Sequence, residues 1–462
     1  MRERVRGKHR SGAFSPRVQQ IAPAPGLTAP SAQQHVRPSI WAALTGPGGS
    51  QVQIRPLLSA FAASLIVFTP CHALAQTQAQ PDDNVSVRER PRPEYDPLGL
   101  RFGSFTANAQ LDLGATSTDN LFAQSSGAEQ DDIVYTVSPN VQLKSDWSRH
   151  ALEVQAGARF TNHQDFSSED ANSHYVRAVG RLDVGTRTSI SATAGIAHEV
   201  EPRTDPDSPV TLDPVEYDRT EASLNAQHTF NRFRVSGGVA RTEYSFDGSQ
   251  SFRDNEETVA RGRLDAELTP RIGVLLQATA DERDYDRDVP FDLDSSGRTV
   301  LAGVTINFTD LMRGEFSVGQ FSRDYDDPGI GTVDGLAASG DLDWYITRLT
   351  TLHFSARRNA ESVVGGGTGA PFVETTYGAR VDHELLRNVI LTAGVQAGKR
   401  EYDNIIDRKD DFVYGEAGAD YIVNRRVSLR ARYNFDQVDS SGVDAYRDYD
   451  VNAFTLGVTL RL

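Results

Sequence analysis

The sequence predicts an all-β fold, a transmembrane antiparallel up-and-down β-barrel of about 16–18 strands with both termini on the same side. Three observations predict it. From residue 103 onward, apolar and polar residues alternate with the period of two that β-strands show. The alternating segments run for about 11–14 residues, and the connections alternate between short turns and longer polar loops.

The alternation is clearest in three segments. In residues 152–160 one phase reads Leu, Val, Ala, Ala, Phe, and the other phase reads Glu, Gln, Gly, Arg. Residues 300–308 and 427–434 repeat the pattern. A strand of a soluble protein runs for about five or six residues, whereas a tilted strand needs about 9–11 to cross a membrane. The length therefore favours a membrane barrel over the alternatives, a soluble β-sandwich or a β-solenoid.

The connections give the strand number. Eight short turns, for example near Gly185 and Asn231, join sixteen strands in pairs. A first strand near 104–116 and a last strand near 452–462 bring the total to eighteen. Bacterial barrels have short periplasmic turns and longer outer loops, and their even strand number leaves both termini in the periplasm.

A leader precedes the barrel. Residues 57–68 are the one strongly apolar run, Arg55 comes before it, and Ala73-Leu74-Ala75 follows as a cleavage pattern. Such a run is too short to span a bilayer as a helix, and a buried core helix, the alternative, leaves the cleavage pattern unexplained. We therefore expect a mis-called upstream extension (1–50), a secretory signal peptide (51–75), a flexible periplasmic lead-in (76–102) and the barrel (103–462).

Composition excludes several classes of protein. No run of eighteen or more apolar residues occurs, which argues against an α-helical membrane protein. Residues 76–462 contain 39 basic and 62 acidic residues. So acidic a chain repels phosphate backbones, and we expect no nucleic-acid partner. The one cysteine, Cys71, lies in the predicted signal peptide, so the mature chain would have neither disulfides nor a cysteine metal site.

Many charges fall in the polar phase of the predicted strands. On a lipid-facing wall each would cost about 2–4 kcal/mol near the membrane centre, so we expect them to face the lumen. A barrel of this size has room for an aqueous channel. Acids outnumber bases among these residues, which predicts a modest preference for cations. The predicted lumen-facing charges are Arg261, Arg263, Asp265, Glu267, Asp341, Asp343, Arg380, Asp382, Glu384, Glu416, Asp420, Arg430 and Arg432.

Tyr244, Tyr285, Tyr325 and Tyr402 recur about 12–14 residues beyond the preceding short turns, or about 30 Å up a tilted wall, where barrels carry an aromatic girdle. Three of them lie in a repeated tetrapeptide, Arg-Asp/Glu-Tyr-Asp. We interpret the tyrosines as a girdle flanked by loop charges. The alternative is a ring that binds an acidic glycan or a divalent ion.

The C-terminal strand contains Thr455, Gly457, Leu460 and Leu462 in the spacing polar-x-Gly-x-x-hydrophobic-x-hydrophobic. This resembles the terminal signal by which the barrel-insertion machinery recognises its substrates, although Leu stands where Phe or Trp is usual. The resemblance implies that this machinery and the lipid of an outer membrane are partners of the chain.

The stretch Tyr95-Asp96-Pro97-Leu98-Gly99-Leu100-Arg101, then Gly103-Ser104-Phe105, then Thr118-Asp119-Asn120-Leu121-Phe122-Ala123 resembles the opening of one family. It is similar to the putative β-barrel porin 2 family of outer-membrane proteins. The resemblance implies a Gram-negative outer-membrane location and a link to capsular or exopolysaccharide export, with the export apparatus as a partner. The family carries no catalytic residues to transfer.

No nucleotide-binding, serine-hydrolase, zinc-protease or EF-hand motif occurs, so we expect no enzyme, no cofactor, no catalytic residue and no metal site. The leading hypothesis is a passive, porin-like channel associated with polysaccharide export or envelope assembly. The second is a structural or adhesion barrel with no open pore. The third is a rim lipase or protease, in which His163, His174 or His198 would meet loop acids such as Asp170.

Overall fold

The computed structural model describes residues 85–205, 213–286, 292–309, 311–362, 371–402, 406–445 and 448–462. By its internal contacts the chain divides into Met1–Pro30 and Ser31–Leu462, and every described residue belongs to the second unit. The predicted upstream extension, the predicted signal peptide and residues 76–84 of the lead-in lie outside the described residues, so these assignments stay predictions. No described helix is long and apolar enough to cross a membrane.

Within the described residues, nineteen strands form one sheet. The short strand β1 pairs with β2, whereas β2 to β19 are 13–16 residues long. The strands are β1 (Leu100–Phe102), β2 (Phe105–Thr118), β3 (Asp132–Ser145), β4 (Ala151–His163), β5 (Ala171–Val184), β6 (Thr188–Val200), β7 (Glu216–Phe230), β8 (Phe233–Phe246), β9 (Asn255–Thr269), β10 (Ile272–Tyr285), β11 (Ser295–Thr309), β12 (Met312–Tyr325), β13 (Thr332–Thr347), β14 (Thr350–Ser362), β15 (Pro371–Leu386), β16 (Val389–Tyr402), β17 (Lys409–Asn424), β18 (Val427–Ser441) and β19 (Tyr449–Arg461).

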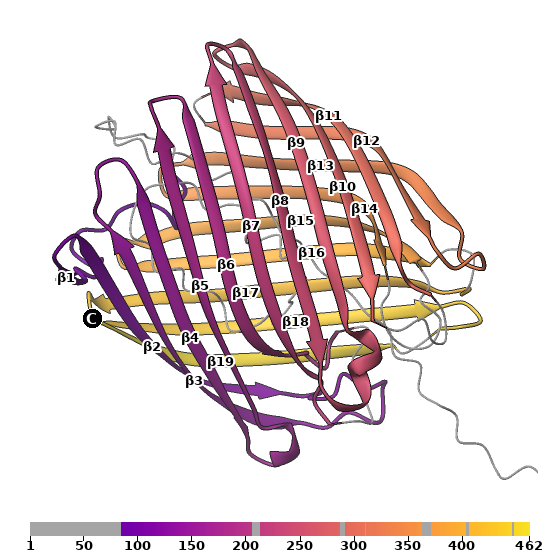
Figure 1. The fold of residues 1–462 in the computed structure, drawn as a ribbon. Helices are drawn as coiled ribbons and strands as arrows, with labels where there is room; N and C mark the ends of the chain where they lie inside the picture. The colour runs from indigo at the N-terminus through magenta and orange to yellow at the C-terminus, as the bar shows by residue number, and fades with distance from the viewer. Residues whose placement is uncertain are drawn as a thin grey trace, which may run out of the picture. The chain divides into compact units, whose positions relative to one another are not determined.

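The eighteen long strands close on themselves. Each pairs antiparallel with the next along the chain, and β19 pairs antiparallel with β2, where Gly457 lies opposite Gly114. Figure 1 shows the closure, with the yellow last strands beside the indigo first ones. The result is a closed up-and-down barrel of eighteen strands, which confirms the predicted fold class at the upper end of the predicted strand number.

Short turns and longer loops alternate around the barrel. β7 ends at Phe230 and β8 begins at Phe233, so Asn231 and Arg232 alone connect them. Asn231 has a φ of 52°, a left-handed conformation that Asn tolerates better than most side chains and that such tight hairpins require. Two of the connections at the opposite end contain the short 3-10 helices η2 (Ser167–Glu169) and η3 (Gly248–Arg253).

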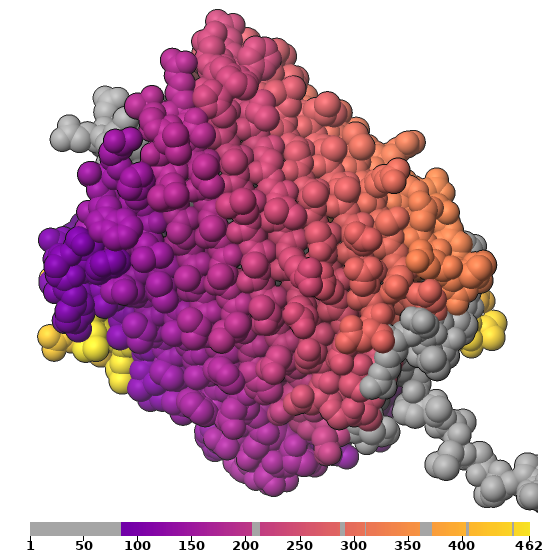
Figure 2. Space-filling view, in the orientation of Figure 1, coloured from indigo at the N-terminus to yellow at the C-terminus, as the bar shows by residue number. Residues whose placement is uncertain are grey.

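The two phases of each strand have different surroundings. In one phase apolar side chains are exposed: Ile196 is 60% exposed, and Leu276 and Val300 are each 52% exposed. In the other phase polar and charged side chains are mostly buried or half-buried. Since successive side chains of a strand point to opposite faces, the barrel has one apolar face that is open to its surroundings and one polar face. Figure 2 shows one side of the wall as a continuous packed surface.

Buried apolar side chains gather in small clusters rather than in a central core. One cluster lies where β12 and β13 meet their connecting loop and contains Phe321, Tyr325, Ile330, Val333, Ala337 and Val373. Another contains Val87, Ile390 and Ile422 and lies at the short-turn end of the barrel. The polar face therefore depends on ion pairs and hydrogen bonds for most of its packing.

Candidate functional site: the charged face of the barrel

The thirteen predicted lumen-facing charges share the polar phase of their strands. Glu384, Asp420, Arg430 and Arg432 are the most buried of them, none more than 5% exposed. The others are half-buried, except Glu267, which is exposed beside the turn between β9 and β10. None of them lies in the phase that carries the exposed apolar side chains.

One ion pair indicates which side of the wall this phase faces. Arg263 on β9 donates to Asp265 of its own strand at 2.7 Å and to Glu315 on β12 at 2.8 Å. Two further strands lie between β9 and β12, and neighbouring strands are about 4.8 Å apart. Side chains diverge on the convex side of a curved sheet and converge on its concave side. The contact between Arg263 and Glu315 therefore favours the concave side for the charged phase.

Acids and bases pair both along the strands of this face and between neighbouring strands. Arg380 lies 3.0 Å from Asp382 on the same strand. Asp420 on β17 contacts two arginines of β18, Arg432 at 2.5 Å and Arg430 at 3.6 Å. Because a half-buried charge is costly unless it is paired, this pairing explains how so many ionised groups can be packed on one face.

The four predicted girdle tyrosines lie on this charged face. Tyr244, Tyr285, Tyr325 and Tyr402 are each at most 9% exposed. A girdle contacts lipid and would lie in the exposed phase, so the observed position differs from that of a girdle. For three of the four, the tetrapeptide gives the reason: residues two apart on a strand share a face, so Tyr285, Tyr325 and Tyr402 lie on the same face as the arginine two residues before them. Tyr244 shares its face with Thr242, which is 1% exposed.

Those arginines, which were predicted to be loop charges, lie within the strands on the charged face. Arg283 donates to Glu257 at 2.8 Å. Arg400 is 0% exposed, donates to Glu374 at 2.9 Å, and lies over the ring of Phe412 at 4.2 Å from its centroid. The spacing Arg-x-Tyr was the available signal, because it puts a long cation and a ring on one face.

Residues 85–96, hereafter the docked segment, were predicted to be flexible but lie against the charged face. Val87 is 0% exposed and packs with Ile390 and Ile422 near two short turns. Its backbone N–H donates to Thr351 Oγ1 at 3.1 Å. The segment is folded on itself as well, because the guanidinium of Arg92 donates to the carbonyl oxygen of Val87 at 2.7 Å.

Every second residue of the docked segment from 88 to 92 is an arginine paired with an acid of the wall. Arg88 contacts Asp382 at 2.7 Å and Asp420 at 3.6 Å. Arg90 and Arg92 both contact Glu384, at 3.3 and 3.0 Å. Burial lowers the pKa of Arg88, but the carboxylates of Asp382 and Asp420 raise it by more, so that this pKa lies above its usual value.

Three residues of the predicted insertion signal, Thr455, Gly457 and Leu460, lie in β19 at the seam with β2, and Leu462 directly follows the strand. Thr455 is 1% exposed, and its hydroxyl lies 2.8 Å from that of Thr116 across the seam. Gly457 lies opposite Gly114. The apolar members of the signal, Leu460 and Leu462, are 40% and 62% exposed. Their recognition by the insertion machinery stays a prediction.

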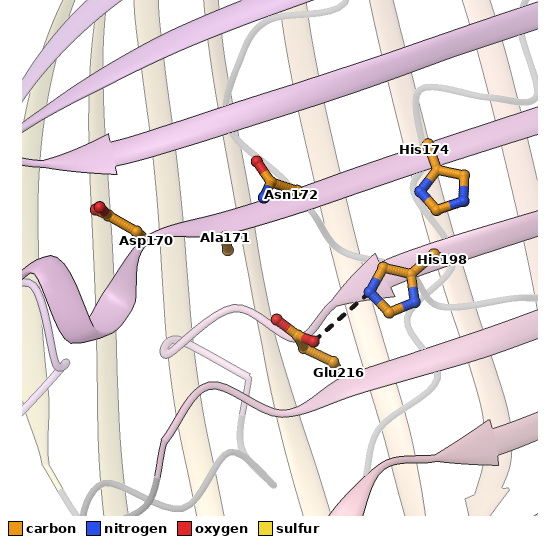
Figure 3. Close-up of a pocket in the computed structure, with 6 residues that line it drawn as sticks. All are labelled: Asp170, Ala171, Asn172, His174, His198 and Glu216. Carbon is orange, nitrogen blue, oxygen red and sulfur yellow. Dashed lines mark ion pairs between the residues drawn. The ribbon is translucent and has the colours of Figure 1, made fainter.

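Two of the rim histidines line a pocket of about 280 Å³ beside the longer loops. The rings of His174 and His198 stack with centroids 5.4 Å apart, and Figure 3 shows Glu216 pointing at His198. His198 Nδ1 lies 2.8 Å from Asp218, and its Nε2 lies 3.6 Å from Glu216. Both ring nitrogens therefore already face carboxylates. The residues that line the pocket, Asp170, Ala171, Asn172, His174, His198 and Glu216, include no serine, threonine or cysteine that could act as a nucleophile.

Asp292, Asp294 and Asp326 form the single group of three or more potential metal-ligand side chains that converge within the described part of the chain. Burial raises the pKa of Asp294, and the negative charges of its acidic neighbours raise it further. Calcium takes six to eight oxygen ligands, and three loop carboxylates specify no such geometry. The cluster by itself therefore identifies no metal site.

The fold and its exposed apolar phase define the class of the protein, an outer-membrane β-barrel. Residues 92–462 match the family model described as Putative beta-barrel porin 2, and the chain belongs to this family. No curated protein matches the sequence.

Three solved structures show a distant likeness to the chain. Outer membrane protein OpdK of Pseudomonas aeruginosa has 12% identity and a TM-score of 0.43 over 77% of this chain and 99% of that chain. OpdL of the same organism has 13% identity and a TM-score of 0.43 over 78% and 100%. OccAB3 of Acinetobacter baumannii has 12% identity and a TM-score of 0.44 over 78% and 100%.

Proposed function

We propose that this porin-family barrel is a passive channel for small hydrophilic solutes whose lumen is lined by the charged phase. The contact between Arg263 and Glu315 carries the proposal. It joins side chains of two strands that are separated by two others, and such side chains come this close only on the concave side of a curved wall. A barrel of sixteen to eighteen strands encloses an aqueous channel. Water and opposite charges then solvate side chains that would each cost about 2–4 kcal/mol against lipid.

We further propose a modest preference of the channel for cations. Among the thirteen lumen-facing charges five are bases and eight are acids. A lumen lined with an excess of one charge concentrates ions of the opposite sign. The preference is modest because most of the acids lie beside an arginine, as Asp420 does beside Arg432.

A planar bilayer containing the purified mature barrel under a KCl gradient tests both statements. We expect stepwise conductance and a reversal potential that favours K⁺, with a preference that weakens near 1 M salt, where the Debye length is about 3 Å. Asp341→Asn with Asp343→Asn should reduce the preference. Asp411→Asn with Glu401→Gln, which removes two acids from the exposed phase, is the matched control. Anion selectivity would overturn the charge argument, and silence at every voltage would overturn the channel.

The second candidate function is a structural or adhesion barrel without an open pore. It is favoured by the same ion pairs, because arginines and acids that meet across strands occupy lumen space, and by the docked segment. The bilayer experiment separates the two candidates. An enzyme is the least supported candidate, since the pocket beside His198 is lined by two histidines and two acids but by no serine, threonine or cysteine.

We propose the association with capsular or exopolysaccharide export on the family resemblance alone. The proposed partners are outer-membrane lipid, the barrel-insertion machinery and the polysaccharide-export apparatus. Deleting the gene and quantifying surface polysaccharide tests the association. An unchanged amount and chain length of polysaccharide would remove the export role and leave the channel.

A further inference from the structure

We propose that the docked segment, residues 85–96, sets the size limit of the pore by narrowing its short-turn mouth, and that Arg88, Arg90 and Arg92 are the positioning residues that hold it there. The inference rests on the proposed channel function, since only an open pore has a size limit. It goes beyond that function by naming the part of the chain that selects solutes by size.

The wall contacts of the segment place it on the lumen side. Thr351, Asp382, Glu384 and Asp420, which receive its hydrogen bonds and ion pairs, all belong to the polar phase of β14, β15 and β17. Leu385, which follows Glu384 on the opposite face of β15, is 54% exposed. The segment and the exposed apolar phase therefore lie on opposite sides of the wall.

The turn contacts place the segment at one end of the lumen. Arg387, in the turn between β15 and β16, donates to the carbonyl oxygen of Pro91 at 3.2 Å. Arg425, in the turn between β17 and β18, donates to that of Pro93 at 2.7 Å. Arg90 also donates to the carbonyl oxygen of Arg348, in the turn between β13 and β14. Three successive short turns thus hold the segment across their part of the mouth.

The segment is a built structure rather than an extended strand of chain. The backbone N–H groups of Glu89 and Arg90 each donate to the carbonyl oxygen of Ser86 at 3.1 Å. Those of Tyr95 and Asp96 each donate to that of Arg92 at 2.7 Å. The segment therefore forms two consecutive turns. The guanidinium of Arg92 joins them, because it donates to backbone carbonyls at positions 87 and 90.

The arginines are the part of this arrangement that binds the wall. Glu384 is 4% exposed and contacts both Arg90 and Arg92. A carboxylate with so little exposure requires a compensating charge. The arginines of the segment supply that charge, so docking of the segment stabilises Glu384 of the wall. Two acids of the segment make other contacts. The side chain of Glu94 is 68% exposed, near the turn residue Arg387, and Asp96 accepts the backbone N–H of Arg92 at 2.6 Å.

Liposome swelling with a series of neutral sugars of increasing size tests the proposal, because neutral solutes report width independently of charge. Arg88→Gln/Arg90→Gln/Arg92→Gln should admit larger sugars than the wild type. Its single-channel conductance should rise about two-fold, since a packed segment adds a layer about 10 Å thick to one side of the mouth. Replacing the same three residues by Lys keeps the charges and should keep the wild-type size limit.

The matched control is Arg101→Gln/Arg149→Gln/Arg187→Gln. It removes three exposed arginines from the same end of the barrel, for which the structure shows no ion pair with the wall. This control should swell like the wild type. A control that widens the pore as much as the triple variant does would overturn the positioning role.

A disulfide tether separates undocking from misfolding. Val87 and Ile390 belong to one buried cluster, and Cys71, the one native cysteine, lies in the predicted signal peptide. With Val87→Cys/Ile390→Cys in the triple-Gln background, the pore should therefore exclude larger sugars when the disulfide is oxidised and admit them when it is reduced. Equal swelling in both states would overturn the inference while leaving the channel intact. Deleting residues 85–96 gives a further comparison. If the wild type does not conduct and the deletion variant does, the segment closes the pore completely. If neither protein conducts, both the proposed channel and the inference are refuted.

Discussion

Leu276 on β10 is a position at which the assignment of the two phases can be tested directly. Its side chain is 52% exposed, and its cross-strand neighbours are Leu264 and Ala302, so it lies within a continuous apolar surface. Leu276→Arg places a guanidinium in that surface. Thr279→Arg, three residues further along the same strand, is the matched control, because Thr279 is half-buried in the polar phase.

An arginine facing lipid near the membrane centre costs about 2–4 kcal/mol. At position 279 the new charge would lie opposite Arg261, and a pair of like charges across two strands costs at most about 1 kcal/mol. We therefore expect Leu276→Arg to lower the free energy of unfolding by at least about 1 kcal/mol more than Thr279→Arg does. The repulsion by Arg261 destabilises the control variant, so it can only reduce the expected difference between the two variants.

Urea unfolding of the barrel in phospholipid vesicles, followed by heat-modifiable gel mobility, measures the difference. If the two variants lose equal stability, or if Thr279→Arg loses more, the exposed phase does not face lipid. The assignment of the charged residues to the lumen would then fail with it.

Three further predictions concern other parts of the chain. N-terminal sequencing of the membrane-embedded protein should begin at Gln76, and a mature protein that retains residues 1–50 would contradict both the predicted signal peptide and the predicted upstream extension. Arg400→Ala leaves the buried carboxylate of Glu374 without its guanidinium and should lower the free energy of unfolding by about 3–5 kcal/mol. Arg241→Ala, at a mostly exposed ion pair, should lower it by at most about 1 kcal/mol. Similar losses of stability in urea titrations would argue against burial as the cause. Burial raises the pKa of Asp294 in the folded protein. Above this raised pKa the ionised carboxylate destabilises the fold, whereas below the unfolded pKa of about 3.9 the carboxyl is protonated in both states and has no such effect. Asp294→Asn should accordingly raise the urea midpoint at neutral pH and leave it unchanged near pH 3, and a variant that is less stable at neutral pH would contradict this.

The eighteen strands were predictable because each one is specified locally. Alternation in residues 152–160 or 427–434 needs no knowledge of the rest of the chain, and a turn such as Asn231 marks its hairpin by its own conformational preference. The even strand number allows the last strand, β19, to pair antiparallel with β2. The phase of each strand was equally local, which is why Arg261 and Arg430 could be assigned to one face without a structure.

The tyrosines and the docked segment were missed for two different reasons. The height of Tyr402 along the wall predicted a girdle position. Tyr402 instead shares the face of Arg400, because residues two apart on a strand point to the same side, and this spacing is already present in the sequence. The docking of Arg88 depends on Asp382 and Asp420, which lie about 300 residues further along the chain. Alternating arginines at 88, 90 and 92 were visible in the sequence, but their partners could be identified only once the strands were arranged in space.

The seam between β19 and β2 bears on how the barrel is assembled. It contains nine residue pairs, from Ala453 opposite Thr118 to Arg461 opposite Gln110, whereas β2 and β3 share fourteen. The seam joins the two ends of the chain, so the loop that must close to form it is the longest in the molecule, and non-local pairing of this kind forms slowly. The seam should therefore be the last ladder to form during membrane insertion. Its amide hydrogens should also exchange with deuterium before those of the ladder between β2 and β3, because a shorter ladder opens at a lower free energy.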